Sequence, residues 1–312
     1  MCFDRSFPAA AVTEFAERLE LGGVDQLWVI EDCFYTAGVS LAATALARTD
    51  RLTVGLGILP AVARNPAITA MEIATLAELA PGRVLAGIGH GVQDWMEQMG
   101  ARTPSPLTTL DEVLTTVRRL LRGETVDVDG REVTMRGVAL DRPPAIVPPV
   151  LAGVRGPKSL ALAGRACDGV VLAEGAGPTY VRESIAHAGG PDGFHVSVFT
   201  ALCLIDDATI AHRAMAPFVA GLLEHPQAAI RAHPHFDELT ERFTARGIDG
   251  IVEMPTDWWI ELGAIGDMDA VMAHVGALAE AGADDVALFP SPDVDEARVD
   301  IDTVIEIRRA LG

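Results

Sequence analysis

Short apolar strands alternate with amphipathic helices along almost the whole chain, and this alternation restricts the fold to the α/β class. The phrases GGVDQLWVI, RACDGVVLA and AGADDVALF each place a small residue and an aspartate just before a strand, which indicates a weak repeat of one strand-helix unit. We expect strands in MCFD at the start and in residues 24–30, 52–59, 84–88, 149–154, 169–173, 195–204 and 285–289. This order predicts a (β/α)8 TIM barrel. A doubly wound open sheet is the alternative, although no GxGxxG follows the first strand.

One further helix and a hairpin are expected between the fourth and fifth strands. Residues 110–121 carry apolar side chains at helical spacing, and Thr109 with Glu112 fits a capping box at the start of that helix. A hairpin is expected next, within an insertion near residues 123–140. No linker or low-complexity tract divides the sequence, so we expect one domain over residues 1–312.

Composition excludes several classes of partner. The formal net charge is −20 and the basic residues are scattered, which argues against nucleic acid or an anionic membrane surface. No stretch reaches the roughly 18 apolar residues of a membrane span. The four cysteines lack ligand spacing, which favours reduced thiols. We therefore expect a soluble, cytoplasmic protein with a small-molecule substrate and no bound metal.

Glycine and polar residues gather where the expected strands end, and a barrel places its chemistry at those ends. The fourth strand ends in His90 between Gly89 and Gly91, and glycine lets a backbone approach a ligand closely. Glu31 and Asp32 follow the second strand. They are candidates for polar contacts or a proton relay, with a helix cap as the alternative. His90 is a candidate acid or base, with a hydrogen-bonding or structural role as the alternative.

The segment GVRGPKSL places glycines, Arg155 and the only lysine, Lys158, at the start of a helix. Free backbone N–H groups and the helix dipole favour an anion such as a phosphate at that position. The alternative is a simple tight turn with both cations in solvent. Glu174 follows the next strand and completes the polar residues at the strand ends.

Three long segments resemble the bacterial luciferase-like superfamily, and most closely its deazaflavin branch, which includes methylenetetrahydromethanopterin reductase. They are WVIEDCFYTAG, VGLGILPAVARNPAITAMEIATLAELAPGRVLAGIGHGV and PPVLAGVRGPKSLALAGRACDGVVL. The resemblance implies a (β/α)8 barrel, usually dimeric, that binds coenzyme F420 or FMN at its mouth. It also implies a cis peptide bond at Gly57-Ile58, in a bulge that supports the ring of the cofactor.

The resemblance also implies the site residues. The cofactor phosphate is expected on the segment from Val154 to Pro157, and the ring beside the ends of the third and fourth strands. The cofactor-binding residues expected are Gly57, Ile58, Leu59, Gly89, His90, Gly91, Val154, Arg155, Gly156, Pro157 and Glu174. The candidate catalytic residues are Glu31, Asp32 and His90. Some deazaflavin sugar-phosphate dehydrogenases carry Asp-His after the second strand, where this chain has Glu31-Asp32, and this departure weakens a sugar-phosphate reaction.

Three functions follow as hypotheses. The first is an oxidoreductase that moves a hydride between F420 and a small organic substrate. The second is an FMN-dependent monooxygenase that uses reduced flavin and O2 and is supplied by a separate flavin or F420 reductase. The third is a flavin or F420 binding protein without turnover.

Two other motifs have less specific readings. His233 and His235 have the spacing of a metal-binding HxH, but their polar, Pro-interrupted surroundings favour a surface loop. Trp258 and Trp259 fit either a substrate lid or a packing contact in the core or a dimer.

Overall fold

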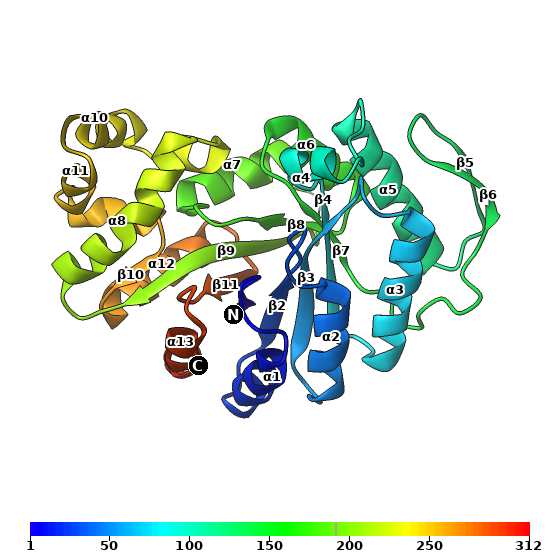
Figure 1. Ribbon diagram of the computed structural model, residues 1–312, viewed down its shortest axis with the longest axis horizontal. Coiled ribbons are helices and arrows are strands. Elements are labelled where there is room, and N and C mark those ends of the chain that lie inside the picture. Colours follow the sequence, from blue (N-terminus) through cyan, green and yellow to red (C-terminus); the bar gives the residue numbers. More distant parts are fainter. Residues whose placement is uncertain (191) are drawn as a thin grey trace.

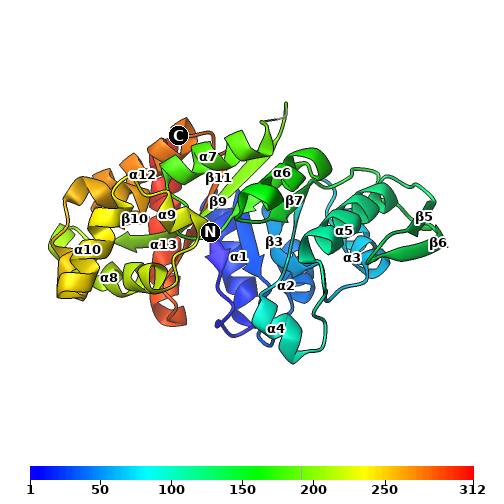
Figure 2. The same cartoon turned by 90° about the horizontal axis from the view of Figure 1, so that it is seen from above.

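The computed structural model, which describes residues 1–190 and 192–312, is an α/β barrel with a helical excursion at one end (Figures 1 and 2). Eight parallel strands follow the order β1-β2-β3-β4-β7-β8-β9, with β11 paired to β9. They are β1 (Cys2–Phe3), β2 (Gln26–Ile30), β3 (Thr53–Pro60), β4 (Val84–Gly89), β7 (Val150–Gly153), β8 (Gly169–Leu172), β9 (His195–Leu204) and β11 (Asp285–Phe289). These are the eight strands that the sequence predicts, and the barrel prediction is confirmed.

The first and last strands meet through side chains. β1 lies beside β11, and the Gln26 amide on β2 donates a hydrogen bond to Asp285 on β11 over 2.5 Å. The N-terminal ammonium of Met1 donates to the Gln26 carbonyl over 3.0 Å. These contacts bring the two ends of the curled sheet together.

Helices cover the outside of the sheet (Figure 1). Between the barrel strands lie α1 (Ala11–Leu21), α2 (Gly38–Ala47), α3 (Pro66–Leu79), α4 (Gln93–Gln98), α5 (Pro106–Leu121), α6 (Pro157–Ala166) and α7 (Pro178–Ala188). α12 (Met268–Glu280) precedes β11, and α13 (Val294–Leu311) ends the chain. Proline opens α3, α5, α6 and α7, in the first turn where the missing N–H has no helical partner in any case.

The long strand β9 carries the helical excursion. It consists of α8 (Ala208–Glu224), α9 (Ala228–Arg231), α10 (Phe236–Arg246), α11 (Ile248–Val252) and the 3-10 helix η1 (Thr256–Glu261). A short strand, β10 (Ala264–Gly266), then pairs with the far end of β9. The excursion has its own apolar core, and the sequence pattern did not indicate β10.

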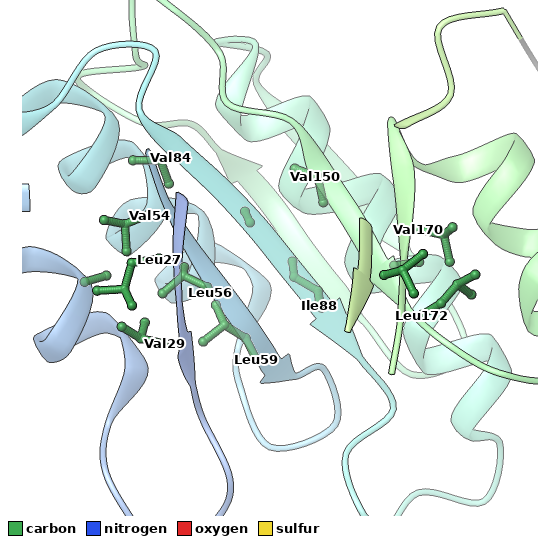
Figure 3. Close-up of a cluster of buried hydrophobic side chains, with 14 of the residues drawn as sticks. Leu27, Val29, Val54, Leu56, Leu59, Val84, Ile88, Val150, Val170 and Leu172 are labelled. Carbon is green, nitrogen blue, oxygen red and sulfur yellow. The ribbon is translucent and has the colours of Figure 1, made fainter. Parts of the chain in front are cut away.

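Two layers of side chains form the core of the barrel. Inside the sheet, Cys2, Trp28, Leu151, Phe199 and Ala287 pack together from five strands. Outside it, alternate side chains of the same strands pack against the helices, as Figure 3 shows for Leu27, Val54, Leu56 and Ile88. This alternation follows from the period of two along a strand, and burial on both faces explains why the strands are apolar throughout.

The segment after α5 forms the antiparallel hairpin of β5 (Val126–Asp129) and β6 (Thr134–Val138). The predicted capping box is wrong, because α5 begins at Pro106 after Ser105, which places Thr109 inside the helix. The Glu112 carboxylate instead accepts backbone N–H groups from Arg131, Glu132 and Val133 at 2.7 to 2.9 Å. Glu112 therefore fastens the hairpin to α5. In the part of the chain described, no helix has the length and apolar character needed to cross a membrane.

Candidate active site

The end of β3 departs from regular strand geometry. The peptide bond between Gly57 and Ile58 is cis, as the sequence resemblance implies, and the pairing of β3 with β4 shifts register between Leu56 and Leu59. Leu59 returns to the core and is fully buried against the helices (Figure 3). Of the three consecutive residues expected to bind the cofactor, Ile58 is the one whose side chain is partly exposed.

The glycines of β4 and β7 make room for Ile58. A Cβ on Gly153 would lie 2.0 Å from Ile58 Cδ1, and one on Gly87 would lie 2.4 Å from Ile58 Cγ2. A Cβ on Gly89 would meet the carbonyl oxygen of Gly153 at 2.6 Å and Ile58 Cδ1 at 3.3 Å. Real Cβ atoms do not approach so closely, so only glycine fits at these positions. Gly87 and Gly89 therefore admit a neighbouring side chain and backbone, where the sequence predicted the approach of a ligand.

The first turn of α6 follows β7 and lies open. Gly156 is its N-cap and has no side chain to bond the first-turn N–H groups, and a Cβ on Gly156 would meet no atom within 4 Å. Lys158 is exposed in the same turn. Val154 is buried in the core at the start of this turn. Open N–H groups beside a cation form a setting suited to an anion.

Arg155 is held by polar neighbours at the same edge. Its Nη1 donates to Gln227 Oε1 over 3.0 Å, and its Nη2 lies 3.5 Å from Glu174 Oε1. The Tyr180 hydroxyl donates to the Arg155 carbonyl over 2.5 Å. Gln227 lies in the helical excursion, so this contact joins the excursion to the α6 loop.

A side chain of this protein caps the first turn of α7. Glu261 of η1 accepts hydrogen bonds from the backbone N–H of Thr179 at 3.0 Å and from its hydroxyl at 2.7 Å. A Cβ on Gly177, the N-cap of α7, would lie 2.3 Å from the Glu261 carbonyl oxygen. Of the two neighbouring helix starts, α6 is therefore the one open to an external anion.

Glu31 serves the local structure. Its Oε2 accepts the N–H of Gly38, the first residue of α2, at 2.8 Å, while its Oε1 accepts from Arg64 at 2.8 and 3.0 Å. Arg64 also pairs with Glu72 at 2.5 Å. Both carboxylate oxygens of Glu31 are thus engaged, and this matches the helix-cap alternative of the sequence analysis.

Asp32 faces the barrel mouth from the end of β2. It pairs with Arg5, which follows β1. Burial raises the pKa of the Asp32 carboxyl above its usual value, against the opposing effect of Arg5, and Glu174 and Asp4 raise it further. Its Oδ1 makes no side-chain hydrogen bond among the described residues, whereas both oxygens of Glu31 are engaged, so Asp32 is the better placed of the two to exchange a proton.

His90 connects β4 to α6. Its Nε2 lies 2.9 Å from Ser159 Oγ in the first turn of α6, and its Nδ1 is buried without a hydrogen-bond partner among the described residues. Burial lowers the pKa of His90, which favours the neutral ring. The buried Nδ1 has no access to solvent, so the Ser159 contact through Nε2 is the polar interaction that His90 brings to this rim.

Two residues that contact the site could not be predicted from the sequence. Arg5 and Ser159 have no motif spacing, and they reach the site because β1 ends and α6 begins at the same rim. His233 is buried and bonds to the Trp258 carbonyl at 3.1 Å, so the predicted surface loop is wrong for this residue. Its neighbour His235 stacks on the Trp258 ring with centroids 4.3 Å apart. Both tryptophans are buried in the excursion core, which matches the packing alternative.

Comparison with known proteins identifies the family. The sequence profile described as luciferase-like monooxygenase matches residues 4–285. The chain belongs to this family. It is 35% identical to a 5,10-methylenetetrahydromethanopterin reductase of Methanolobus tindarius over 171 residues, which cover 54% of this chain and 52% of that protein. It is 27% identical to the enzyme of the same name from Archaeoglobus fulgidus over 286 residues, or 86% of each chain.

Other relatives and solved structures give a consistent picture. An F420-dependent glucose-6-phosphate dehydrogenase of Beutenbergia cavernae is 29% identical over 181 residues, 54% of each chain. Among solved structures, the coenzyme F420 dependent tetrahydromethanopterin reductase from Methanopyrus kandleri superposes with a TM-score of 0.78 at 21% identity, covering 98% of this luciferase-like chain and 96% of that one. A monooxygenase from Streptomyces bottropensis superposes with a TM-score of 0.70 at 21% identity, covering 96% and 92%. These structures show that the fold is shared.

Proposed function

We propose that this luciferase-like protein is an oxidoreductase that transfers a hydride between coenzyme F420 and a small organic substrate. The observation that carries the proposal is the hydrogen bond between His90 and Ser159. It joins the end of β4, beside the partly exposed Ile58 side chain, to the open first turn of α6. An apolar side chain and an open helix start thus lie at one rim. A deazaflavin cofactor needs both, because its flat ring needs an apolar surface and the phosphate in its side chain needs an anion site. Relatives named as F420-dependent support the choice of cofactor.

The residues present fit such a cofactor. Ile58 offers an apolar surface held by tightly packed glycines, and rigid support of this kind is what orients a bound ring. The backbone N–H groups after Gly156, with Lys158 and Arg155 nearby, would hold the phosphate. The His90 ring, which is bonded to Ser159 through Nε2, would border the same rim. When bound, F420 supplies or accepts the hydride, and the protein orients the ring and excludes water.

Asp32 would donate and accept the proton that accompanies the hydride. Burial raises its pKa, which makes proton uptake from the substrate side easier, and one of its carboxylate oxygens makes no other side-chain hydrogen bond among the described residues. Arg5 holds the carboxyl in place. Reduction of a carbonyl or imine needs a proton on the oxygen or nitrogen, and oxidation of the product returns that proton to the same carboxylate.

The protein would act as a homodimer. The outer face of α3 exposes the apolar side chains of Ile68, Met71 and Leu79, together with Thr75 and Glu78. A helix of this kind is stable in water when a second surface covers it. The covering surface we propose is the same face of a second copy, because isologous pairing is the commonest arrangement in homo-oligomers.

The proposed function is tested by titrating the protein with F420 and with FMN and following the fluorescence of each cofactor. We expect F420 to bind at least a hundredfold more tightly than FMN. Nanomolar binding of FMN without binding of F420 would replace the proposal with a flavin-dependent monooxygenase, the activity named for the family. Tight F420 binding with no substrate-dependent oxidation by any carbonyl or imine compound would favour a binding protein instead.

A further inference from the structure

Exposed aromatic and apolar side chains lie on the loops that follow β2 and β4, at the barrel end where we propose the cofactor, and Arg5 on the loop after β1 contacts two of them. Phe34 and Tyr35 are 66% and 55% exposed, and Val92 is 46% exposed. Trp95 in α4 is partly exposed. Together with Arg5 we call these residues the mouth patch. Large apolar side chains that gather in solvent mark a binding surface more often than scattered ones do.

Arg5 ties the mouth patch together. Its guanidinium lies 4.8 Å from the centre of the Tyr35 ring and 5.7 Å from the centre of the Trp95 ring. The same guanidinium pairs with Asp32. A cation over aromatic faces is attracted by the ring quadrupoles, so these contacts fix the two rings relative to the proposed proton donor. An aromatic surface is thus held next to the reacting groups.

Phe34 adds a strained element to the mouth patch. Its φ is +75°, in the left-handed region that a bulky side chain seldom adopts. Strain of this kind persists where the surroundings require it, and it gathers at ligand sites. Phe34 is largely exposed, so burial against the described residues does not offset this strain.

The charges around the mouth patch disfavour an anion. Arg5 pairs with Asp32, and the carboxylates of Asp4 and Glu174 act on the same pair, so negative charge surrounds the guanidinium even when Asp32 carries a proton. Arg64, the next cation along the rim, is paired with Glu31 and Glu72. Among the described residues, the recorded contacts bring no uncompensated cation into the patch. A phosphorylated or carboxylated substrate would meet a surface without the pairing that it needs.

We propose that the mouth patch binds the substrate and that this substrate is an uncharged, planar aromatic or conjugated carbonyl compound. Tyr35 and Trp95 would stack on its plane, and Phe34 and Val92 would cover it. Guanidinium N–H groups of Arg5 that Asp32 leaves free would donate to its oxygen. This inference rests on the proposed function for the chemistry, although the binding surface is independent of which cofactor is used.

The test uses ligand-observed NMR on the full-length protein with three probes. Acetophenone is planar and uncharged, benzoate is its anionic counterpart, and glucose 6-phosphate is a phosphorylated sugar. We expect acetophenone to bind at least tenfold more tightly than either anion. Tyr35→Ala and Trp95→Ala should each weaken acetophenone binding at least fivefold. Ile210→Ala, which removes an exposed side chain from α8, is the matched control and should leave binding unchanged.

Three results would overturn the inference. The first is binding of benzoate or glucose 6-phosphate as tight as that of acetophenone. The second is unchanged acetophenone binding in both aromatic variants, with Tyr35→Phe and thermal unfolding as the check that the fold is intact. The third is an oligomer that dissociates on Phe34→Asp, which would assign the patch to a second copy. An F420 titration of the same samples keeps the cofactor proposal separate, because its failure would leave probe binding at the patch intact.

Discussion

The side chain of Ile58 occupies the space that a side chain on Gly153 would need, since a Cβ built on Gly153 lies 2.0 Å from Ile58 Cδ1. The three nearest atoms to that Cβ all belong to Ile58. We call this contact of Ile58 with Gly153, between β3 and β7, the lock. It holds the Ile58 side chain in the position where we propose that it supports the cofactor ring.

Gly153→Ala should destabilise the protein by about 1–3 kcal/mol, the usual cost of overpacking, and should weaken F420 binding. Adding Ile58→Ala removes the clash, so the double variant should lose less stability than the sum of the two single variants. Chemical denaturation measures the free energies of unfolding. Gly89→Ala is the control, because its Cβ meets the backbone oxygen of Gly153 and Ile58→Ala should not rescue it. Strict additivity at Gly153 would contradict the lock.

Arg155→Ala should weaken F420 binding by about 1–3 kcal/mol, the range of a charge-assisted hydrogen bond. The loss should shrink for the deazaflavin riboside that lacks the phosphate. Fluorescence titration with both ligands measures the difference, and Arg102→Ala on the exposed surface serves as control. Equal losses for the two ligands would remove Arg155 from the phosphate site and leave it the role of holding Glu174 and Gln227.

Glu31→Gln and Asp32→Asn should act on different properties. Glu31→Gln weakens the pairing with Arg64 and should lower stability by about 1–3 kcal/mol while leaving the absorbance of bound F420 unchanged. Asp32→Asn should change that absorbance and the pH dependence of hydride transfer, because it removes the group that we propose to carry the proton. His90→Ala should perturb bound F420 less than Asp32→Asn. If His90→Ala alone alters the cofactor spectrum, the histidine takes the catalytic role.

The sequence predicts the barrel strands well because their signal is local. Apolar runs such as those of β2 and β4 are buried on both faces, and this leaves a pattern that needs no knowledge of neighbours. β10 has three residues and lies after a helical excursion, so it carries no comparable signal. The capping box failed for a related reason. Glu112 had the right spacing for a cap, but its partners lie some twenty residues away in the hairpin.

Part of the candidate site could likewise be predicted from the sequence, and part could not. The glycine positions and the GVRGPKSL turn are visible in the sequence, yet the reason for Gly87 and Gly153 is a side chain on another strand. The contacts of Arg5 and Ser159 could be recognised only in the fold, where the end of β1 and the start of α6 lie at the same rim. Long-range contacts of this kind follow from topology, which single residues do not encode.

Acid should destabilise the protein through His274. Burial lowers the pKa of this residue to about 4, and its two nitrogens bond to the Ile260 carbonyl and the Thr200 hydroxyl. The unfolded chain binds the proton near pH 6.5, so stability should be complete above that pH and fall as the pH drops toward 4. The difference between the folded and unfolded pKa values corresponds to roughly 3 kcal/mol of unfolding free energy. Buried His212 and His233 act in the same direction, while the raised pKa of His195 beside Asp285 opposes it.

Urea unfolding at several pH values measures this dependence. His274→Gln should flatten the curve of unfolding free energy between pH 6.5 and 4, and His187→Gln on the exposed end of α7 is the control. A slope that His274→Gln leaves unchanged would show that other groups govern acid stability.

Met71→Glu should convert the proposed homodimer into monomers, because it places a charge on the exposed apolar face of α3. Sedimentation velocity measures the oligomeric state. Ile210→Glu on α8 is the control, because it places the same charge on an exposed apolar residue outside this face and should leave the dimer intact. A wild-type protein that sediments as a monomer at high concentration would contradict the dimer.

A crystal structure of the protein with F420 bound tests the central claim most directly. The account predicts that the deazaflavin ring contacts the Ile58 side chain and that the phosphate accepts hydrogen bonds from the first turn of α6, after Gly156. It also predicts that Glu261 still caps α7. A phosphate at the start of α7 in place of Glu261, or a ring that makes no contact with Ile58, would contradict the account.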